Sequence, residues 1–550
     1  MYYSNMDGAT KPAATPPETT SPSAATPPAA AATTPASAAP PSPPATGKPQ
    51  GFKLPTVRMM PTDFTHVGQA KVLKGYAEDI LQYTDSTSWL TYNGSYYESS
   101  GSETRARGVA QKFTDLQLRE VEAALKQCKA LAKQSLTDQQ KEDLKQTTKT
   151  MEAYRSHVAQ CRSTGGITGA LRELRPMQLI TVDDLDADPF LLNTPTGTVD
   201  LRTGKMLPHK SSDLITRQTN YSPSLDGIDL WLDALDTFFC GDQELIDYVQ
   251  EIVGLSAIGR VYVEFLIIAY GEGRNGKSTY WNTIAQVLGT YSGSLSAETL
   301  MTQKNNNNAQ PEIAELRGKR LVTASELEEG MRLHTSRVKQ LCSTDIIYAA
   351  KKFLQPTAFR PSHTIVLSTN HLPKVGAIDT GTWRRLLVIP FQATIENDSD
   401  IKNYSEFLCE NAGEAILQWI IEGAMRVITK DYRLQTPAVV QAAVKKYQDE
   451  QNWLAHFLEE CCEVDASYTA PSGEVYTRYR EFCGEYGEYA RSTTDFYTAL
   501  ETRGYYRTRT RSGKIVHGFR LLPKSDDSSI IVTAPDAPAP AAGSEPAATA

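Results

Sequence analysis

Apolar runs separated by polar turns predict short strands and helices through the centre of the chain. The run from Glu264 to Tyr270 is almost wholly apolar, as in a strand that is buried on both faces. A glycine-rich loop follows, and then four apolar residues with helical spacing that end at Gly289: Trp281, Ile284, Val287 and Leu288. Further apolar runs at 321–324, 364–367 and 386–391 predict additional strands. This order favours an α/β fold with a parallel sheet.

Mixed α and β elements are expected before this centre. Asn93-Gly94 between the aromatic runs 88–92 and 95–97 predicts a hairpin in which both turn residues have positive φ. Short strands are expected at 188–193 and 197–201. Between these regions the chain is charged and helical, and a stripe of residues at steps of three and four predicts a packed helical pair: Leu118, Val121, Leu125, Cys128 and Ala132.

The last structured region combines a capped helix with a basic hairpin. Ser492 to Asp495 fits a capping box that opens a helix from Phe496 to Thr502, and two strand-like runs meet at Ser512-Gly513. Between residues 501 and 520, six basic residues and one acidic residue give a net charge of +5. Helix followed by basic hairpin is the layout of a winged helix. We assign DNA contacts to its cations Arg507, Arg509, Arg511 and Lys514.

Composition separates this middle from its two ends. The chain has 550 residues, a net charge of -8 and 31 prolines, of which 12 fall in the first 50 residues. Residues 1–50 are mostly Ala, Pro, Thr and Ser, and the tail 523–550 is similar, so both are expected to be disordered. No apolar run suits a membrane span or a signal peptide, and the eight cysteines form no C-x-x-C pair. We expect an intracellular, cytoplasmic protein without disulfides.

The strongest chemical signal is a phosphate loop. Gly271 to Ser278 fits G-x-x-x-x-G-K-[ST] and stands between the predicted strand and helix. Its backbone N–H groups would surround phosphates, Lys277 would reach the β and γ oxygens, and the Ser278 hydroxyl would bind Mg²⁺. We assign ATP contacts to Gly271, Glu272, Gly273, Arg274, Asn275, Gly276, Lys277, Ser278 and Thr279.

Catalytic partners are expected at the ends of the other strands. Glu326 follows the strand 321–324 and is predicted to act on the attacking water and, with Ser278, to hold the metal. Asn370 follows the strand that begins at Thr364, where an amide would sense the γ-phosphate. Arg384 and Arg385 precede the last strand, and in oligomeric ATPases such a placement presents a guanidinium to the neighbouring subunit's phosphate. The active site would then lie between subunits.

In this compact order the elements resemble superfamily 3 helicases, specifically the C-terminal helicase half of phage and plasmid primases related to the poxvirus helicase-primase. The resemblance runs from about Asp63 to Leu522 and is strongest between Gly271 and Phe391. Outside the ATPase it rests on four stretches: Asp63 to Gly68 with the Trp89 hairpin, Leu192 to Gly204, Trp231 to Gly254, and Pro437 to Tyr447.

The resemblance implies a ring, expected to be a hexamer, with a basic hairpin in its pore. The matching segment is 339–353, and Lys351 and Lys352 are the DNA candidates. Ser343 and Thr344 replace the family's glycines there, and Ser325 stands where many ATPases have a magnesium-binding aspartate. A pore lined with cations would reconcile DNA binding with an acidic chain.

One further cluster has two interpretations. Asp183, Asp184, Asp186 and Asp188 are close in sequence, as in the metal-binding acidic pair of a polymerase-like primase. The second interpretation is a solvated loop, which Pro189 and the absence of a neighbouring histidine or basic cluster favour.

These features predict an ATP- and Mg²⁺-dependent DNA helicase of phage or mobile-element replication, acting in the bacterial cytoplasm if a phage encodes it. Its expected parts are an arm (1–50), an α+β and helical accessory domain (51–235), an AAA+-like ATPase (236–435), a winged helix (436–522) and a tail (523–550). Alternatives are an origin-remodelling initiator, a helicase-primase with priming activity, and a ring scaffold with a dormant ATPase. Partners would be DNA, further copies of the chain, and a separate primase and other replication proteins.

Overall fold

The computed structural model describes residues 52–302, 311–325, 328–349, 357–375, 380–395, 401–486, 489–511 and 513–523. The chain divides into two units, 1–54 and 55–550. Of the first unit only residues 52–54 are described, so the arm predicted at 1–50 lies outside the described residues. The tail predicted at 523–550 lies outside them too, apart from Pro523.

The second unit begins with a helical region around a small antiparallel sheet. Helix α1 (His66–Ala77) precedes strands β1 (Leu81–Thr84), β2 (Ser88–Tyr92) and β3 (Tyr97–Glu98). The long helices α2 (Ser102–Leu131) and α3 (Asp138–Cys161) pack against each other, and α4 (Thr164–Leu174) follows. Val121, Leu125 and Cys128 of α2 are buried, so the predicted helical pair is confirmed.

The hairpin at Asn93-Gly94 forms, but its predicted turn is wrong. Tyr92 pairs with Tyr97, so four residues connect the strands, and of these only Gly94 has positive φ, at 103°. The Asn93 side-chain oxygen accepts hydrogen bonds from the backbone N–H groups of Ser95 and Tyr96. This local capping stabilises a longer loop and removes the need for positive φ at Asn93.

A second small sheet leads into the centre of the chain. It contains β4 (Leu191–Thr194), β5 (Gly197–Asp200) and β6 (Lys205–Leu207), close to the strands that the sequence predicted. Helices α5 (Ile228–Phe239) and α6 (Gln243–Ala257) follow. Leu192 and Val199 of the sheet and Trp231 of α5 belong to the same buried cluster as the central sheet. The core therefore continues across the expected boundary at residue 235.

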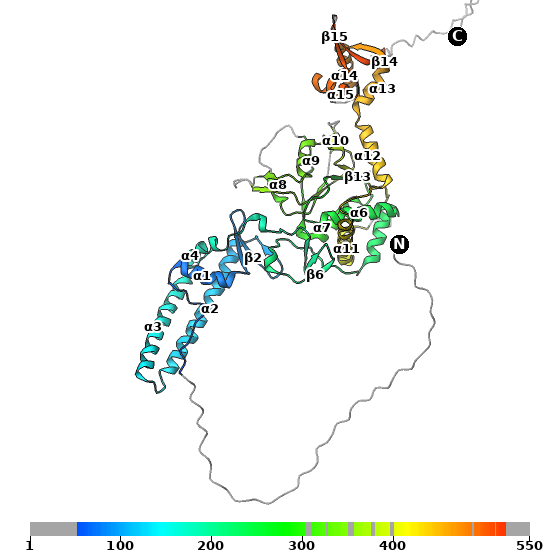
Figure 1. Cartoon of the computed structure of the whole chain (residues 1–550). Helices are drawn as coiled ribbons and strands as arrows, with labels where there is room; N and C mark the ends of the chain where they lie inside the picture. The colour runs from blue at the N-terminus through cyan, green and yellow to red at the C-terminus, as the bar shows by residue number, and fades with distance from the viewer. Residues whose placement is uncertain are drawn as a thin grey trace, which may run out of the picture. The chain divides into compact units, whose positions relative to one another are not determined.

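The central sheet has five strands, all parallel, in the order β13-β7-β12-β9-β8. Figure 1 labels its edge strand β13. The strands are β7 (Leu266–Tyr270), β8 (Ser292–Ser294), β9 (Leu321–Ser325), β12 (Thr364–Thr369) and β13 (Leu386–Pro390). Helices α7 (Lys277–Leu288), α8 (Pro311–Glu315), α9 (Thr335–Leu341), α10 (Thr380–Trp383), α11 (Tyr404–Thr429) and α12 (Ala438–Glu450) connect and cover them. The predicted α/β fold with a parallel sheet is confirmed.

Both faces of this sheet are buried. Along β7, Ile267 and Ala269 join the cluster formed with α5, α6, α7 and α11. Leu266 and Ile268 join a second cluster on the other face, with residues of α9 and with Tyr447 of α12. Burial on both faces explains why the strand sequences are continuous apolar runs. Helix α12 belongs to this core, although the sequence had assigned it to the following domain.

The last region has a core of its own. It contains α13 (Trp453–Cys461), β14 (Cys462–Pro471), α14 (Ser472–Glu485), α15 (Thr493–Thr502), β15 (Arg507–Thr510) and β16 (Gly513–Leu521). The three strands form an antiparallel sheet in the order β14-β16-β15. Ser492 caps α15, so the helix begins three residues before the predicted Phe496.

Two compositional expectations can be compared with the structure. All eight cysteines are unbridged, as their spacing predicted. None of the helices in the described parts of the chain combines the length and the apolar character that a membrane crossing needs.

Candidate phosphate site and nucleic-acid interface

The loop between β7 and α7 has the conformation that its glycines permit. Gly273, Arg274 and Gly276 have positive φ, at 111°, 47° and 77°. Gly276 also packs against the ring of Phe238, where an added Cβ would lie 2.2 Å from Cδ1. Glycine is therefore required at this position both for its backbone angle and for its close approach. The chain turns here so that α7 begins at Lys277.

The side chain of Lys277 lies at the centre of the site. It is only 7% exposed. Its Nζ donates hydrogen bonds to the side-chain oxygen of Asn370 at 2.5 Å, to the carbonyl of Gly271 at 3.1 Å and to the side-chain oxygen of Asn275 at 3.4 Å. Burial lowers the pKa of the Lys277 ammonium. Three oxygens surround a cation here, and a phosphate would supply the same kind of oxygen ligand.

The loop is attached to the end of β13. The Asn275 side chain donates to the carbonyl of Phe391 at 3.2 Å, and the Ile395 N–H donates to the carbonyl of Arg274 at 2.8 Å. Asn275 is buried, whereas the three residues before it, 272–274, face solvent. The exposed positions that a nucleotide could reach are Glu272, Gly273, Arg274 and Ser278. Thr279 is half-buried in the first turn of α7.

Polar residues gather where the parallel strands end. Thr369 of β12 pairs with Tyr270 of β7, so Asn370 comes directly after β12 beside the start of the phosphate loop. Strand β9 ends at Ser325, which pairs with β12 one residue before Thr369. The sequence placed Glu326 next along this edge, and that residue lies outside the described residues. The structure thus brings into contact two residues that the sequence assigned to catalysis separately, Lys277 and Asn370.

Ser278 is the predicted metal ligand that the structure describes. It is exposed in the first turn of α7, where the sequence assigned it to Mg²⁺. Its hydroxyl is an oxygen ligand of the kind that Mg²⁺ binds, together with nucleotide oxygens and water. Within the described ranges, no group of three or more His, Cys, Asp or Glu side chains is placed to hold a metal ion.

Arg384 and Arg385 lie at the amino-terminal end of the parallel strands, whereas the phosphate loop lies at their carboxyl-terminal end. Leu386 pairs with Leu266 at the start of β7, whereas the loop follows the end of β7, four residues or about 13 Å further along the strand. Arg385 is 12% exposed and donates to Glu264 at 2.5 Å and to the carbonyl of Gly381 at 2.8 Å. The Arg384 side chain is 67% exposed and lies 3.7 Å from Glu264. Only Arg384 is free to contact another molecule.

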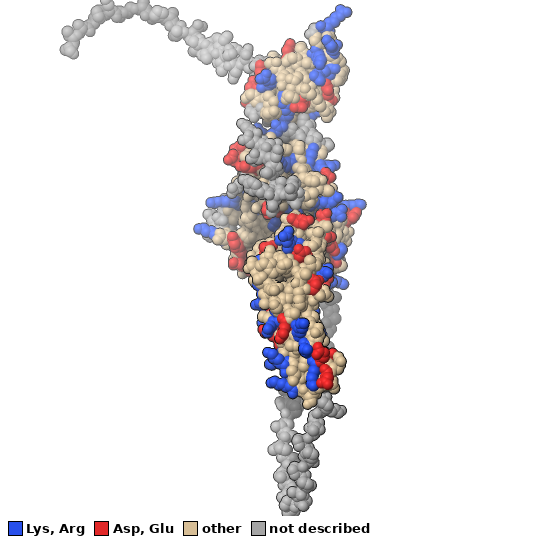
Figure 2. All heavy atoms as spheres, turned by 90° about the vertical axis from the view of Figure 1, so that its left-hand side faces the viewer, with Lys and Arg blue, Asp and Glu red and all other residues tan. Residues whose placement is uncertain are grey.

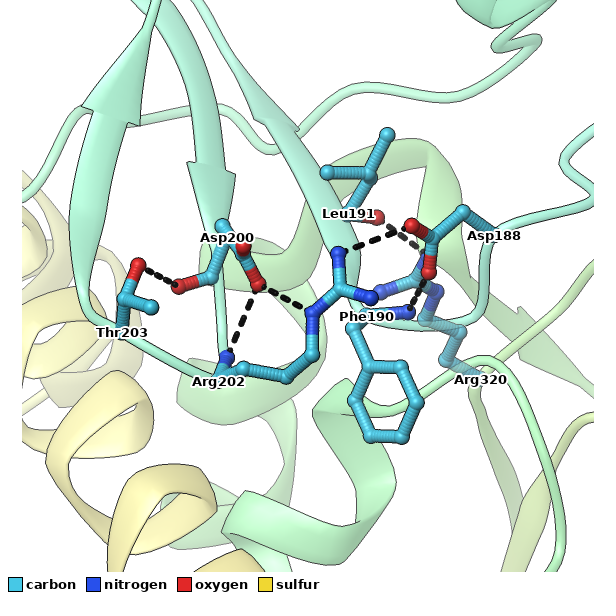
Figure 3. A network of polar contacts seen from close by, with 7 residues as sticks. All are labelled: Asp188, Phe190, Leu191, Asp200, Arg202, Thr203 and Arg320. Carbon is cyan, nitrogen blue, oxygen red and sulfur yellow. Dashed lines mark hydrogen bonds and ion pairs between the residues drawn. The ribbon is translucent and has the colours of Figure 1, made fainter.

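The acidic stretch after residue 182 has structural partners. Asp188 and Asp200 both pair with Arg202, at 2.9 and 2.8 Å (Figure 3). Asp186 accepts hydrogen bonds from the N–H and hydroxyl of Thr216. Asp184 caps the turn that begins at Thr181, and these hydrogen bonds lower the pKa of Asp184. The carboxylates are therefore used in turns and ion pairs, which agrees with the loop interpretation over the metal-binding one.

Sequence reasoning missed the role of Arg320. The Arg320 side chain is only 3% exposed. Its guanidinium donates to the carbonyls of Ala257 and Leu191, at 2.5 and 2.6 Å, and lies over the ring of Tyr291 (Figure 3 shows the bond to Leu191). Arg320 thus connects the β4 sheet, α6 and the strand β9 that follows it. An arginine one residue before a buried strand was the available signal.

The predicted pore segment is partly described. Lys351 and Lys352 lie outside the described residues. On either side, β10 (Ile347–Ala349) and β11 (Thr357–Phe359) form an antiparallel pair, so the predicted hairpin exists. Ser343, which replaces a family glycine, is buried, and its hydroxyl accepts the N–H of Asp345 at 3.0 Å. A serine can therefore cap this turn in place of glycine.

The basic hairpin of the last region forms as predicted. Thr510 pairs with Gly513, so β15 and β16 are joined by two residues. Figure 2 shows basic side chains at the tip that projects at the top of the view, which is the place of β15 in Figure 1. Three of its cations are exposed and have no carboxylate partner among the described residues: Arg509, Arg511 and Lys514. They form the exposed cationic end of the hairpin.

Arg507 differs from these three. It pairs with Glu501 at 2.9 Å and lies over the ring of Tyr497. Arg520 is likewise paired with Glu463, at 2.5 Å. The exposed positions of α15 carry threonines and acids and no cation: Thr493, Thr494, Asp495, Thr498, Glu501 and Thr502. Cations suited to phosphate are thus on the hairpin and not on the helix.

A strand, a glycine loop and a helix, with an amide at the end of the neighbouring strand, define the class of phosphate-loop proteins. Family comparisons add the particular relationship. Residues 70–240 match a family described as D5 N terminal like, and residues 449–514 match one described as Poxvirus D5 protein-like. Residues 269–385 match a family of unknown function, DUF5906. The expected resemblance to poxvirus-type helicase-primases is confirmed on both sides of the phosphate loop.

Similar curated proteins come from large DNA viruses. A protein of Acanthamoeba polyphaga mimivirus named as a helicase, L207/L206, is 28% identical over 38% of this chain and 22% of its own length. A protein of African swine fever virus (isolate Warthog/Namibia/Wart80/1980) named as a primase, C962R, is 25% identical over 55% of this chain and 34% of its own. The chain thus spans between about a fifth and a third of these relatives.

Among solved structures, the chain is similar to the NrS-1 C-terminal region in its apo form. The TM-score is 0.35 and the identity 12%, over 55% of this chain and 77% of that one. This likeness is too weak to carry an argument about fold or function.

Proposed function

We propose that this chain is an ATP-dependent DNA helicase that acts in the replication of a virus, phage or mobile element. The observation that carries the proposal is the meeting of Lys277 and Asn370 at the carboxyl edge of the parallel sheet. A phosphate bound at the loop would contact both, because the lysine ammonium and the amide are 2.5 Å apart. The helicase and primase names of the viral relatives agree with a role in replication.

Each residue of the site has a proposed part. The loop N–H groups and Lys277 bind the β and γ phosphates, and Ser278 with Glu326 would hold Mg²⁺, which neutralises phosphate charge. Asn370 donates its amide N–H to the γ-phosphate once Lys277 turns its ammonium to the nucleotide. Glu326 orients the attacking water. Hydrolysis would thereby change the contacts of Asn370, which directly follows strand β12 of the central sheet.

The place of Arg384 supports the proposal of a ring with active sites between subunits. Arg384 is exposed and lies at the opposite end of the parallel strands from the phosphate loop of its own chain. It is therefore placed to contact the γ-phosphate bound by a neighbouring subunit. Numbered by their order in the chain, the strands run 5-1-4-3-2, which agrees with an AAA+-like core. We propose a homo-oligomer, with six subunits as the expected number. Arg385 would hold Arg384 in place through their shared partner Glu264.

The last region is proposed to be a winged helix that binds DNA through its hairpin. Its elements follow in the order helix, strand, helix, helix, strand, strand. The cations Arg509, Arg511 and Lys514 would contact phosphates, whereas the exposed side of α15 has no cation to offer. Phosphate contacts carry no sequence information, so this binding should be independent of DNA sequence. Arg507 would contribute less, because Glu501 already pairs with it.

The buried clusters suggest revised limits for the proposed domains. The accessory domain would end near residue 185, because β4 and α5 share the core of the central sheet. The ATPase would extend through α12, because Tyr447 packs in its core. The winged helix would then begin at α13, whose Trp453 belongs to a separate cluster.

Fork unwinding tests the main proposal. Purified chain should displace a labelled strand from forks with 3′ or 5′ tails when ATP and Mg²⁺ are present, and DNA should stimulate ATP hydrolysis. The Lys277→Ala variant should lose both activities. Hydrolysis by the wild type without DNA stimulation and without strand displacement would contradict the helicase proposal. Specific footprinting of an origin without displacement would support the initiator alternative instead.

A second candidate function is primer synthesis, because the African swine fever virus relative is named as a primase. The acidic residues that could have formed a polymerase-type metal pair are bound to Arg202, Thr216 and Thr181 instead. We therefore expect no labelled product from ribonucleotides on a single-stranded template. A product that survives Lys277→Ala would establish priming as a separate activity.

A further inference from the structure

The hairpin formed by β10 and β11 has one face in the core and one face in solvent. Tyr348 pairs with Ala358, and Ile347 pairs with Phe359. Ile347, Ala349 and Phe359 are buried in the cluster that covers one side of the central sheet. Because side chains alternate along a strand, Tyr348 and Ala358 occupy the opposite face. The hairpin is thus fixed to the core by one face and presents the other.

The exposed face carries an unusual side chain. Tyr348 is 74% exposed, and Ile346 on the same side is 43% exposed. No other ring in the described parts of the chain stacks on Tyr348. Arg360 lies just beyond β11 on this side, exposed, and its Nη1 donates to the carbonyl of Thr344 at 3.3 Å. An exposed ring and an exposed guanidinium therefore belong to the same face of one hairpin.

This combination suits single-stranded nucleic acid. Every base has a π-face that can stack on an aromatic ring, and an arginine beside it can bind the adjoining phosphate. A docked protein is a poorer occupant, because stable protein interfaces bury about 800 Å² on each partner. Among the residues of this hairpin that the structure describes, the large apolar side chains exposed to solvent are Ile346 and Tyr348, between the charges of Asp345 and Arg360. Among the described residues Asp345 balances Arg360, so stacking on Tyr348 would add to the phosphate contacts that the sequence assigns to Lys351 and Lys352.

We propose that Tyr348 is the centre of a base-stacking platform for single-stranded DNA on the β10–β11 hairpin, with Arg360 as its phosphate contact. The proposal rests on the proposed DNA-translocating function and adds a contact to the bases themselves. Because stacking tolerates all four bases, the platform would grip a strand without reading its sequence. The hairpin packs against the central sheet, and Asn370 directly follows strand β12 of that sheet. The platform would therefore move when the nucleotide site moves.

Fluorescence anisotropy with the full chain tests this platform. The probes are a labelled oligo(dT) strand and a strand of equal length made of abasic sites, each with a non-hydrolysable ATP analogue present. Tyr348→Ala should weaken oligo(dT) binding about 5- to 100-fold, as alanine substitution at a stacking site does. Tyr348→Phe keeps the ring and should stay within about twofold of wild type. On the abasic strand, wild type and Tyr348→Ala should bind equally.

Controls separate stacking from other effects. Phe407→Ala removes an exposed ring from α11 and should leave oligo(dT) binding unchanged. Thermal melting and ATP hydrolysis without DNA should be unchanged in Tyr348→Ala, because the ring touches neither the core nor the phosphate site. Native mass should also be unchanged. A loss of oligomer in Tyr348→Ala would overturn the proposal and make this face a subunit contact.

Two further results would also refute it. One is equal oligo(dT) binding by wild type and Tyr348→Ala, and the other is an equal loss on the abasic strand. Failure of the helicase proposal looks different, because wild type would then fail to unwind forks. If wild type unwinds and Tyr348→Ala binds normally, only the platform is wrong. If wild type binds oligo(dT) through Tyr348 without unwinding, only the helicase proposal is wrong.

Discussion

Arg384 and Arg385 are adjacent in sequence, and the fold predicts opposite consequences for their removal. Arg384→Ala removes an exposed side chain at 3.7 Å from Glu264. An exposed pair of this kind contributes about 0–1 kcal/mol, so the variant should melt like wild type. If Arg384 stabilises the neighbouring subunit's phosphate, ATP hydrolysis should fall about 10³- to 10⁵-fold, as for other arginines in this role. ATP binding should be retained.

Arg385→Ala should instead damage the fold. Its guanidinium is 12% exposed and makes two bonds, to Glu264 and to the carbonyl of Gly381. Hydrogen bonds that involve a charged group contribute about 1.5–3 kcal/mol each, and partial exposure of Glu264 reduces their loss. We expect the free energy of unfolding to fall by about 2–4 kcal/mol. Hydrolysis should fall with the folded fraction, which limited proteolysis and thermal melting would follow.

A mixing experiment tests whether Arg384 acts across an interface. Lys277→Ala subunits have a defective phosphate loop and an intact Arg384, and Arg384→Ala subunits have the reverse. Each variant alone should be inactive. In a mixed ring, an interface with Lys277 from one subunit and Arg384 from the other is complete, so ATP hydrolysis should reappear.

Two outcomes would refute this reasoning. Absence of any recovery on mixing, with mixed rings shown by native mass, would contradict action in trans. Normal hydrolysis by Arg384→Ala, together with a wild-type melting temperature and lost hydrolysis for Arg385→Ala, would reverse the two roles.

Three further predictions follow from single contacts. Gly276→Ala should weaken ATP binding more than Gly273→Ala, because both have positive φ but only the Gly276 Cβ meets a ring, an overpacking that costs about 1–3 kcal/mol; isothermal titration compares them. His363 is buried, which lowers its pKa to about 4, so the unfolded state binds the extra proton and stability should fall as the pH drops from about 6.5 to 4. A matched His363→Leu variant should lose this dependence in denaturant melts. Arg511→Ala should reduce the slope of log affinity against log salt by about 1, whereas Arg520→Ala, already paired, should not.

Local chemistry explains why much of the centre was predictable. The strand, loop and helix around Lys277 are adjacent in sequence, and each has a strong local signal, namely a continuous apolar run, glycines with positive φ, and helical spacing that ends at Gly289. The capped helix at Ser492 and the two-residue hairpin before Gly513 were predictable for the same reason. At Asn93, by contrast, one side-chain oxygen accepts hydrogen bonds from two backbone N–H groups, and a different turn results.

Contacts between distant segments were beyond such reasoning. Arg385 and its partner Glu264 are 121 residues apart in the chain. Arg320 and its partner Leu191 are 129 residues apart. No local pattern states which arginine of a pair will face inward, because that depends on the acid that another segment brings to it. Composition likewise does not show that residues of α5 and α12 pack in the buried clusters of the central sheet.

By itself the sequence determined the phosphate loop, the order of strands and helices and the basic hairpin, because glycine conformation, apolar periodicity and charge act over a few residues. The tertiary structure alone decided which side chains meet. It placed the Asn370 oxygen on the Lys277 ammonium, left Arg384 exposed while burying Arg385, and turned Tyr348 to solvent. The physical reason is that these outcomes depend on strand order and packing, which unite segments that are far apart in the chain.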